Sequence, residues 1–118
     1  MPLQCLIVDD YPPFLQVARA ELERQGLVVV GVATNGAEAL RLARELRPDV
    51  ALVDISLGPE SGFDVAREIT AYVGGVILIS SSDRYADDDY AECVAGSLAA
   101  GFLSKAALSA AAISRLLA

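Results

Sequence analysis

Three aspartates follow short apolar segments of this 118-residue chain, and their type and spacing suit metal chemistry. Asp9 and Asp10 come directly after Cys5–Val8, and Asp54 comes directly after Val50–Val53. Ionised carboxylates at close contact repel one another by about 4 kcal/mol per pair in a protein-like dielectric. Clustering the three would therefore require a divalent cation or a proton that offsets the repulsion. Mg²⁺ suits such an oxygen-rich site, because it accepts one or two carboxylates and keeps several waters.

Two further polar residues end apolar segments. Ser80 follows Val76–Ile79, and Lys105 follows Gly101–Ser104. Either residue alone is an ordinary strand end or a surface charge. Beside an acid cluster, the ammonium could hold a carboxylate or a phosphoryl oxygen, and the hydroxyl could donate a hydrogen bond to an added phosphoryl group. With a carboxylate as nucleophile, these parts match in-line phosphoryl transfer.

The segments that would position these residues alternate between strand and helix. Short apolar runs predict five strands, at Gln4–Val8, Val28–Ala33, Val50–Val53, Val76–Ile79 and Gly101–Ser104. Strands that are apolar on both faces and separated by helices predict a parallel sheet covered on both sides. Right-handed crossovers make this a doubly wound α/β fold, whose ligand crevice lies beyond the carboxyl ends of the strands. The acids, the hydroxyl and the lysine should meet at that edge.

Capping and breaking residues mark the helices between these strands. Helix starts are predicted at Pro12–Pro13, at Asn35 with Glu38 as a capping box, at Ser61 with Asp64 as a second box, and at Asp87–Asp89. Helix ends are predicted at Gly26, Pro48 and Gly74–Gly75, and an Ala/Leu-rich helix should close the chain.

Composition excludes several classes of function. The net charge is −7 and no basic run is present, so nucleic-acid binding through this chain is not expected. Histidine is absent, which excludes histidine catalysis, histidine metal ligands and a phosphohistidine carrier role. Cys5 and Cys93 show no paired spacing and are interpreted as buried cysteines in a reducing cytosol. No signal peptide or bilayer-length apolar run is found, so we expect a cytoplasmic protein without membrane contact.

In order and spacing, five pieces of the chain resemble the receiver domain of bacterial two-component response regulators: Val8–Asp10, Leu52–Ile55, Gly62, Val76–Ser80 and Gly101–Lys105. The likeness covers essentially the whole chain. It implies a flavodoxin-like fold, with a doubly wound five-stranded parallel sheet in the strand order 2-1-3-4-5 and helices on both faces. It also implies a single receiver domain over residues 1–118.

The resemblance assigns a role to each polar residue at the predicted edge. Asp54 would be the phosphoacceptor. Asp10 would bind Mg²⁺ directly, Asp9 mainly through water, and Asp54 and the backbone carbonyl of Ser56 would be further ligands. Lys105 would pair with the phosphoryl group.

Other residues would transmit and time the signal in such a domain. Ser80 would move to bond the phosphoryl group, and Phe102 would swing inward behind it, although a plain core aromatic is an equally good interpretation of Phe102. The face made by helix four, strand five and helix five would then change shape. Ser56 and Ser82 occupy the two positions that tune self-dephosphorylation, and both are small enough to leave room for an attacking water.

Two departures from the family pattern concern loops. Family members commonly have proline, often with a cis bond, where Ala106 follows Lys105. A cis bond without proline costs about 2.5–4 kcal/mol, so the geometry of this bond is open. Gly58 stands where the loop after the phosphoacceptor usually has proline, and Pro59 comes one residue later. We expect a local change only, because the interval from Asp54 to Gly62 is family-like.

These observations predict a receiver that takes a phosphoryl group from the phosphohistidine of a sensor histidine kinase or a phosphotransfer protein. The chain would then signal by contact with a downstream protein or a detached output domain, without being a turnover enzyme; whether it forms a homodimer is left open. One alternative is a binding module of the same fold that never uses phosphorylation. Another is a phosphatase with an aspartyl intermediate, which usually needs an acid where Ser56 stands, two residues past Asp54.

Overall fold

The computed structural model describes residues 2–81, 96 and 98–118 of the chain. Its main sheet has five parallel strands in the spatial order β2-β1-β3-β6-β7. They are β1 (Gln4–Val8), β2 (Val28–Ala33), β3 (Val50–Asp54), β6 (Val76–Ser80) and β7 (Gly101–Ser104). Counted along the chain, these strands give the order 2-1-3-4-5, so the predicted doubly wound fold is confirmed. The first, second and fifth strands also have the predicted bounds.

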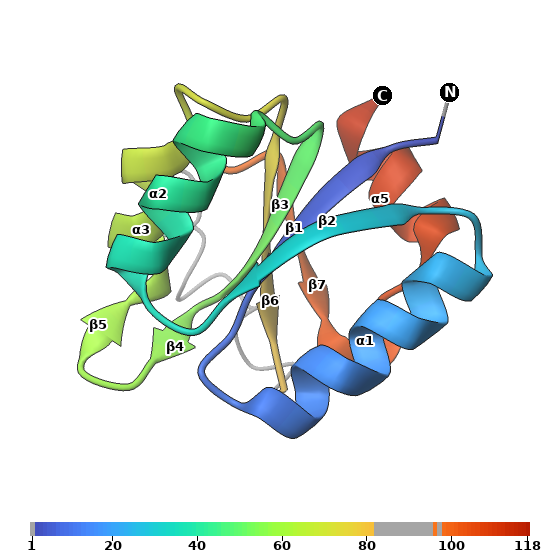
Figure 1. Ribbon diagram of the computed structural model, residues 1–118, viewed down its shortest axis with the longest axis horizontal. Coiled ribbons are helices and arrows are strands. Elements are labelled where there is room, and N and C mark those ends of the chain that lie inside the picture. The colour runs from blue at the N-terminus through green and yellow to red at the C-terminus, as the bar shows by residue number, and fades with distance from the viewer. Residues whose placement is uncertain (1, 82–95, 97) are drawn as a thin grey trace.

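Helices cover both faces of the sheet. Helices α1 (Pro12–Arg24) and α5 (Ala110–Leu117) lie on one side, and α2 (Gly36–Leu46) and α3 (Gly62–Ile69) lie on the other (Figure 1). Successive side chains of a strand point to opposite faces, so each strand supplies both layers of the core. In β1, for example, Leu6 and Val8 pack beneath α2 and α3, whereas Cys5 and Ile7 pack beneath α1 and α5.

Local capping explains where α1 and α2 begin. Pro12 opens α1 as predicted. The Asn35 side chain accepts a hydrogen bond from the N–H of Glu38 at 2.9 Å, which confirms the first capping box. The return bond differs slightly from the prediction, because Glu38 accepts from the N–H of Thr34, at 2.9 Å.

The second predicted capping box is wrong. Ser61 precedes α3, but its side chain makes no capping hydrogen bond. Instead, Ser61 belongs to a two-stranded antiparallel hairpin, in which β4 (Ser56–Leu57) pairs with β5 (Glu60–Ser61). Asp64 forms an ion pair with Arg67 rather than reaching back to the helix start. The hairpin fixes the backbone ahead of α3, and the sequence analysis did not predict it.

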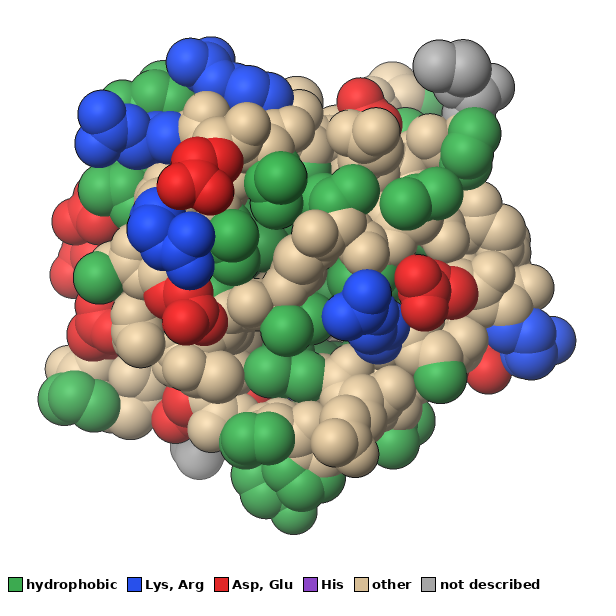
Figure 2. Space-filling view, viewed as in Figure 1, with side chains coloured by type: hydrophobic (Ala, Val, Ile, Leu, Met, Phe, Trp, Pro, Cys, Tyr) green, Lys and Arg blue, Asp and Glu red, His purple; other side chains and the backbone are tan. Residues whose placement is uncertain are grey.

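The surface carries interleaved charges of both signs. Figure 2 shows basic side chains beside acidic ones over the helices of the viewed face. Within single helices, Arg41 forms an ion pair with Glu45 and Arg24 forms one with Glu21. Within the described part of the chain, no helix has the length and hydropathy needed to cross a membrane. The fourth helix predicted from Asp87–Asp89 lies outside the described residues, as do Ser82 and Cys93.

Candidate functional site

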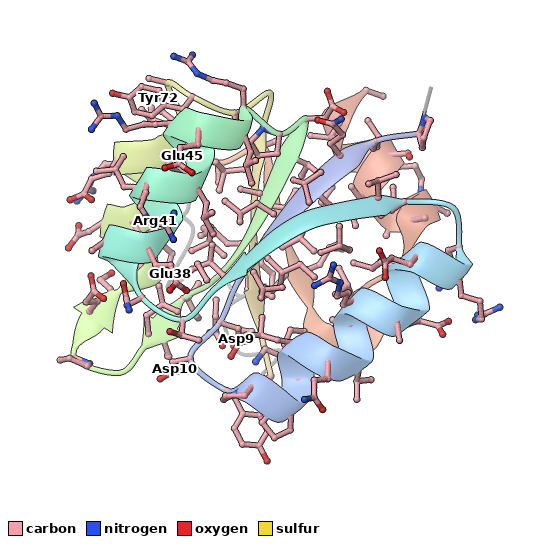
Figure 3. All side chains as sticks on the ribbon, viewed as in Figure 1. Asp9, Asp10, Glu38, Arg41, Glu45 and Tyr72 are labelled. Atoms are coloured by element: carbon pink, nitrogen blue, oxygen red, sulfur yellow. The ribbon has the colours of Figure 1, made fainter. Side chains whose placement is uncertain are left out.

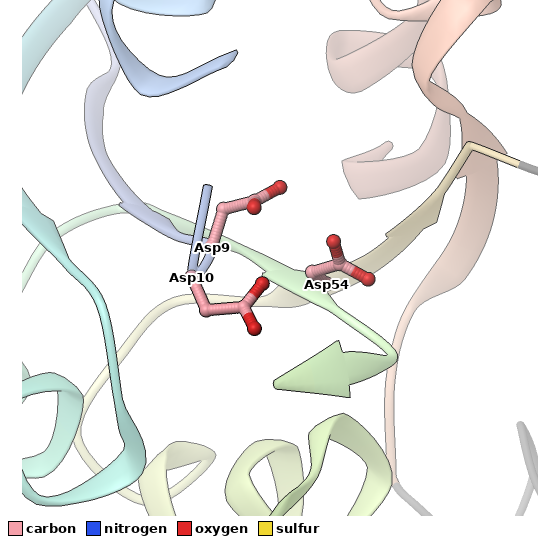
Figure 4. Close-up of side chains that lie close together, drawn as sticks. All are labelled: Asp9, Asp10 and Asp54. Carbon is pink, nitrogen blue, oxygen red and sulfur yellow. The ribbon is translucent and has the colours of Figure 1, made fainter. Parts of the chain in front are cut away.

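The three aspartates lie together at the carboxyl end of the sheet. β1 and β3 are parallel neighbours with Val8 opposite Val53, so Asp9 and Asp54 follow directly on adjacent strands. One carboxylate oxygen from each of Asp9, Asp10 and Asp54 lies within 4.8 Å of the other two (Figure 4). Asp9 is fully buried and Asp54 is 7 % exposed, while Asp10 is exposed. The predicted acid cluster therefore exists and is mostly removed from water.

Short backbone contacts orient two of these carboxylates. Asp9 Oδ1 accepts a hydrogen bond from the N–H of Tyr11 at 2.9 Å, and Asp54 Oδ1 accepts one from the N–H of Ser56 at 2.9 Å. Both bonds span two residues, the pattern by which aspartate side chains stabilise a turn in the backbone that follows them. In each case the second carboxylate oxygen, Oδ2, takes no part in the turn. Figure 3 places Asp9 and Asp10 at the turn between β1 and α1.

Lys105 supplies a cation to this cluster. Its Nζ lies 2.5 Å from Asp9 Oδ2 and 2.9 Å from Asp54 Oδ2, and its side chain is only 17 % exposed. It reaches the site from a short 3₁₀ helix (Lys105–Ala107) that follows β7 directly. No cis peptide bond occurs in the described segments, so the Lys105–Ala106 bond is trans.

Burial and charge shift the protonation equilibria of the site. Burial raises the pKa of Asp9, and the nearby Asp54 adds to this, while hydrogen bonds from Lys105 and from the Tyr11 N–H oppose it. Burial disfavours the charged form of Lys105, yet its hydrogen bonds and charge interactions with the two carboxylates outweigh this effect, so the pKa of Lys105 is raised. The lysine is thus a permanent cation between two acids.

A divalent cation fits the donors present. Asp9 Oδ2 is buried and faces the ammonium of Lys105 at 2.5 Å, but that one cation also faces Asp54 Oδ2. One ammonium shared by two buried carboxylates leaves a net negative charge, which a divalent ion would offset. Together with Asp10 and Asp54, Asp9 gives an all-oxygen set, which Mg²⁺ prefers over softer metals. The residues therefore fit the predicted ion.

The other predicted site residues in the described part of the chain are Ser80, Phe102 and Ser56. Ser80 ends β6, is 4 % exposed, and comes after the residue that pairs with Asp54, so it shares the same sheet edge. Phe102, on β7, packs partly buried against the core beneath α2 and α3, as a plain core aromatic would, and its switch role stays a prediction. Ser56 is exposed in β4, and its carbonyl as a metal ligand stays a prediction.

Glycines allow the close approach of the loop to the strand ends. A Cβ added at Gly62 would lie 2.5 Å from Ile55 Cα and would collide with the carbonyl of Asp54, so α3 can begin here only with glycine. Gly58 and Pro59 form the two-residue turn of the hairpin. Gly58 has φ +64° and occupies the first turn position, where a type II′ turn has glycine. The hairpin explains the departure seen at Gly58 in the sequence, because proline cannot adopt a positive φ.

Two residues that contribute to the site were not assigned to it from the sequence. Phe14 carried no predicted role in the site, yet its ring centroid lies 4.1 Å from Lys105 Nζ, a cation–π distance. Glu60 carried no prediction, yet its carboxylate accepts a hydrogen bond from the N–H of Gly36 at 2.9 Å, 24 residues away. For Phe14 the available signal was its place one turn after the acidic pair.

Comparison with protein families settles the family of this chain. The family model described as the response regulator receiver domain matches residues 5–116. The chain belongs to the response regulator receiver domain family. As a receiver domain, it is a unit of phosphorylation-dependent signalling, of a family that binds Mg²⁺ at an acidic pocket and interacts with histidine kinases and output domains.

Individual relatives agree with this membership. Over 92 residues the chain is 33 % identical to the transcriptional regulatory protein KdpE of Mycobacterium tuberculosis, covering 78 % of this chain and 40 % of KdpE. Over 86 residues it is 36 % identical to protein-glutamate methylesterase/protein-glutamine glutaminase 3 of Hahella chejuensis, covering 72 % of this chain and 25 % of that protein. The receiver thus spans well under half the length of these curated relatives, and a receiver by itself is not a turnover enzyme.

A solved structure shows the same fold. The signal receiver domain of a modulated diguanylate cyclase from Desulfovibrio desulfuricans G20 has a TM-score of 0.81 and 34 % sequence identity to this chain. The match covers 99 % of this chain and 91 % of that domain. The receiver fold therefore extends over the full set of elements described above.

Proposed function

We propose that Asp54 accepts a phosphoryl group from the phosphohistidine of a sensor histidine kinase or a phosphotransfer protein, in a reaction that requires Mg²⁺. The observation that carries this proposal is the placement of Asp9, Asp10, Asp54 and Lys105 in one cluster at the sheet edge. The chain contains no histidine, so the donor must be another protein or domain. On this proposal residues 1–118 act as a single receiver domain.

Each residue has a definite part in the transfer. A carboxylate oxygen of Asp54 forms a bond to phosphorus while the bond from phosphorus to the donor nitrogen breaks, and the leaving imidazole keeps the electron pair. Lys105 already lies 2.9 Å from Asp54 Oδ2, so it holds the nucleophile and then the phosphoryl oxygens. Asp10, Asp54 and the Ser56 carbonyl, with Asp9 mainly through water, would hold Mg²⁺, and the ion would neutralise the phosphoryl oxygens during the transfer.

Phosphorylation would change the packing around β6 and β7. It adds nearly two negative charges and new acceptor oxygens beside Ser80, whose hydroxyl would bond them. Movement of Ser80 would make room for Phe102 to turn inward, and the face formed by helix four, β7 and α5 would be read by a downstream protein or a detached output domain. Ser56 and Ser82 would set how fast water removes the group. A cytoplasmic location is a further part of the proposal, and size measurements on the phosphorylated and unphosphorylated chain would show whether a homodimer forms.

A labelling experiment tests the central step. The native chain incubated with a small acyl phosphate and Mg²⁺ should gain one phosphoryl group by intact mass, and chelation of Mg²⁺ should prevent it. Asp54→Asn should abolish labelling, whereas Asp64→Asn, which removes an exposed carboxylate of α3 outside the cluster, should leave it unchanged. Labelling that persists in Asp54→Asn would refute the assignment. A native chain that binds Mg²⁺ but never takes the group would favour the phosphorylation-independent binding module.

A further inference from the structure

The β4–β5 hairpin borders the acid cluster through two contacts. The N–H of Ser56 donates to Asp54 Oδ1 at 2.9 Å, which fixes one oxygen of the nucleophile. At the tip, a Cβ added to Gly58 would lie 3.5 Å from Asp10 Oδ2, so the tip backbone lies against the exposed acid. The position of the hairpin therefore limits where two of the three carboxylates can lie.

Glu60 joins this hairpin to the start of α2. Its Oε1 accepts the N–H of Gly36, the first residue of α2, at 2.9 Å. A Cβ at Gly36 would collide with Glu60 Oε2, so the glycine leaves the space that the carboxylate occupies. A carboxylate at a helix N-terminus makes a charge-assisted hydrogen bond and lies at the positive end of the helix dipole. In Figure 1 the hairpin lies beside this end of α2.

The hairpin needs such an anchor more than α2 does. Each of its strands has only two residues, and a hairpin of that size is not stable by itself. Helix α2, by contrast, is already capped by Asn35 and by Glu38, whose capping bonds lie within residues 34–38 and do not involve the hairpin. The contact therefore contributes chiefly to the placement of the hairpin.

We propose that Glu60 is a positioning residue, which holds the β4–β5 hairpin against α2 and thereby sets the geometry in which Asp10 and Asp54 bind Mg²⁺. This rests on the proposed function of the pocket. The hydrogen bond of Glu60 goes to Gly36 rather than to the acids, so Glu60 acts through the backbone of Ser56 and Gly58. Without this hydrogen bond the hairpin can move away from α2. The carboxylates of Asp10 and Asp54 then keep their charge but lose the alignment needed to bind the ion.

Two variants break the contact from opposite sides, and one matched control leaves it intact. Glu60→Ala removes the carboxylate, and Gly36→Ala displaces it while favouring the helix itself. Glu38→Ala is the control, since it also removes one glutamate and one hydrogen bond at the same helix end, the bond to the N–H of Thr34 (Figure 3). Mg²⁺ affinity of the purified full chain is measured by titration calorimetry, and urea unfolding reports stability.

We expect Glu60→Ala and Gly36→Ala to bind Mg²⁺ about tenfold more weakly, the scale seen when outer-shell partners of metal ligands are removed. Glu60→Gln should restore most of the affinity, because its amide oxygen still accepts the hydrogen bond. Glu38→Ala should lower stability while keeping the affinity within about twofold of the native value.

Two results would overturn the role of Glu60. One is native Mg²⁺ affinity in both Glu60→Ala and Gly36→Ala, and the other is an equal loss of affinity in Glu38→Ala. Phosphoryl labelling is scored separately from calorimetry. A native chain that binds Mg²⁺ but takes no phosphoryl group contradicts the proposed function, yet the calorimetric comparison still decides the role of Glu60.

Discussion

Replacing Lys105 by methionine should make the stability of the receiver depend strongly on Mg²⁺. In the described structure the Lys105 ammonium lies 2.5 Å from Asp9 Oδ2 and 2.9 Å from Asp54 Oδ2, and both acids are buried. Methionine keeps the length of the side chain but removes the charge. The two carboxylates then face each other with no cation between them unless the metal binds.

The expected cost follows from the burial of the pair. Removing one partner of a buried ion pair destabilises a protein by about 3–5 kcal/mol. Because the Lys105 side chain keeps 17 % exposure, we expect the lower end, about 3 kcal/mol, when Mg²⁺ is chelated. With the metal present the loss should be smaller, since a divalent ion about 4 Å from an ammonium is repelled by about 8 kcal/mol at an effective dielectric of 20. We expect the native lysine to relieve most of this repulsion by moving away from the ion.

We expect a tenfold gain in Mg²⁺ affinity for the variant, which corresponds to about 1.4 kcal/mol. The stability deficit should therefore fall from about 3 to about 1.6 kcal/mol at saturating Mg²⁺. Urea unfolding of both proteins, with a chelator and then across a MgCl₂ series, measures each value. Arg19→Met is the control: it removes a cation from an exposed pair with Glu23 at 3.6 Å, and should cost under about 1 kcal/mol with no dependence on Mg²⁺. A deficit for Lys105→Met that is equal with and without Mg²⁺ would refute the reasoning.

Three further predictions concern Asp9, Gly62 and Asn35. Burial raises the pKa of Asp9 above its ordinary 3.8, so the folded state favours the protonated carboxyl. The resulting gain in folding free energy is fully present below pH 3.8 and is lost as the pH rises through the raised pKa. With Mg²⁺ chelated, Asp9→Asn should be more stable than the native chain near neutral pH, and urea unfolding should show this difference vanish toward pH 3.8; a difference that does not vary with pH would contradict it. Gly62→Ala should lose at least about 1–3 kcal/mol in the same assay, whereas Gly96→Ala, where a Cβ meets nothing within 4 Å, should lose none. Asn35→Ala should lose about 1 kcal/mol of unfolding free energy by removing the cap of α2, and an unchanged urea midpoint would argue against that cap.

The strands were predictable because burial on both faces leaves a clear pattern in the sequence, whereas their order came from the resemblance to receiver domains. Every residue of β3 and β6 is buried, and the apolar runs at Val50–Val53 and Val76–Ile79 record this directly. The polar residues at the strand ends, Asp54 and Ser80, proved to be part of the strands themselves. Once the sheet is parallel, the meeting of its carboxyl ends follows from topology, so the acid cluster could be predicted as well.

The β4–β5 hairpin could not be predicted by the same means. Strands of two residues are too short to show any period, and only the Gly58–Pro59 pair indicated a turn. The hairpin also explains why the capping prediction at Ser61 is wrong: a serine followed by an acid at the third position satisfies the capping pattern, but pairing with Ser56 fixes the local backbone instead. Contacts such as Glu60 with Gly36 join residues 24 positions apart and leave no local signal.

The electrostatics of the pocket explain why a stable core has to support it. Asp9 is fully buried beside a second buried acid, an arrangement that opposes folding unless a cation is present. The sheet can hold it because the residues before each acid, Val8 and Val53, are packed at zero exposure and fixed in register with each other. A slip of one residue would turn the apolar side chains of that strand to the opposite face, so the register that builds the core also aligns the acids. The repulsion between the carboxylates therefore favours the binding of Mg²⁺, which removes it. A phosphoryl group added to Asp54 would change the charge of a site in which carboxylate repulsion and the attraction of Lys105 already oppose each other.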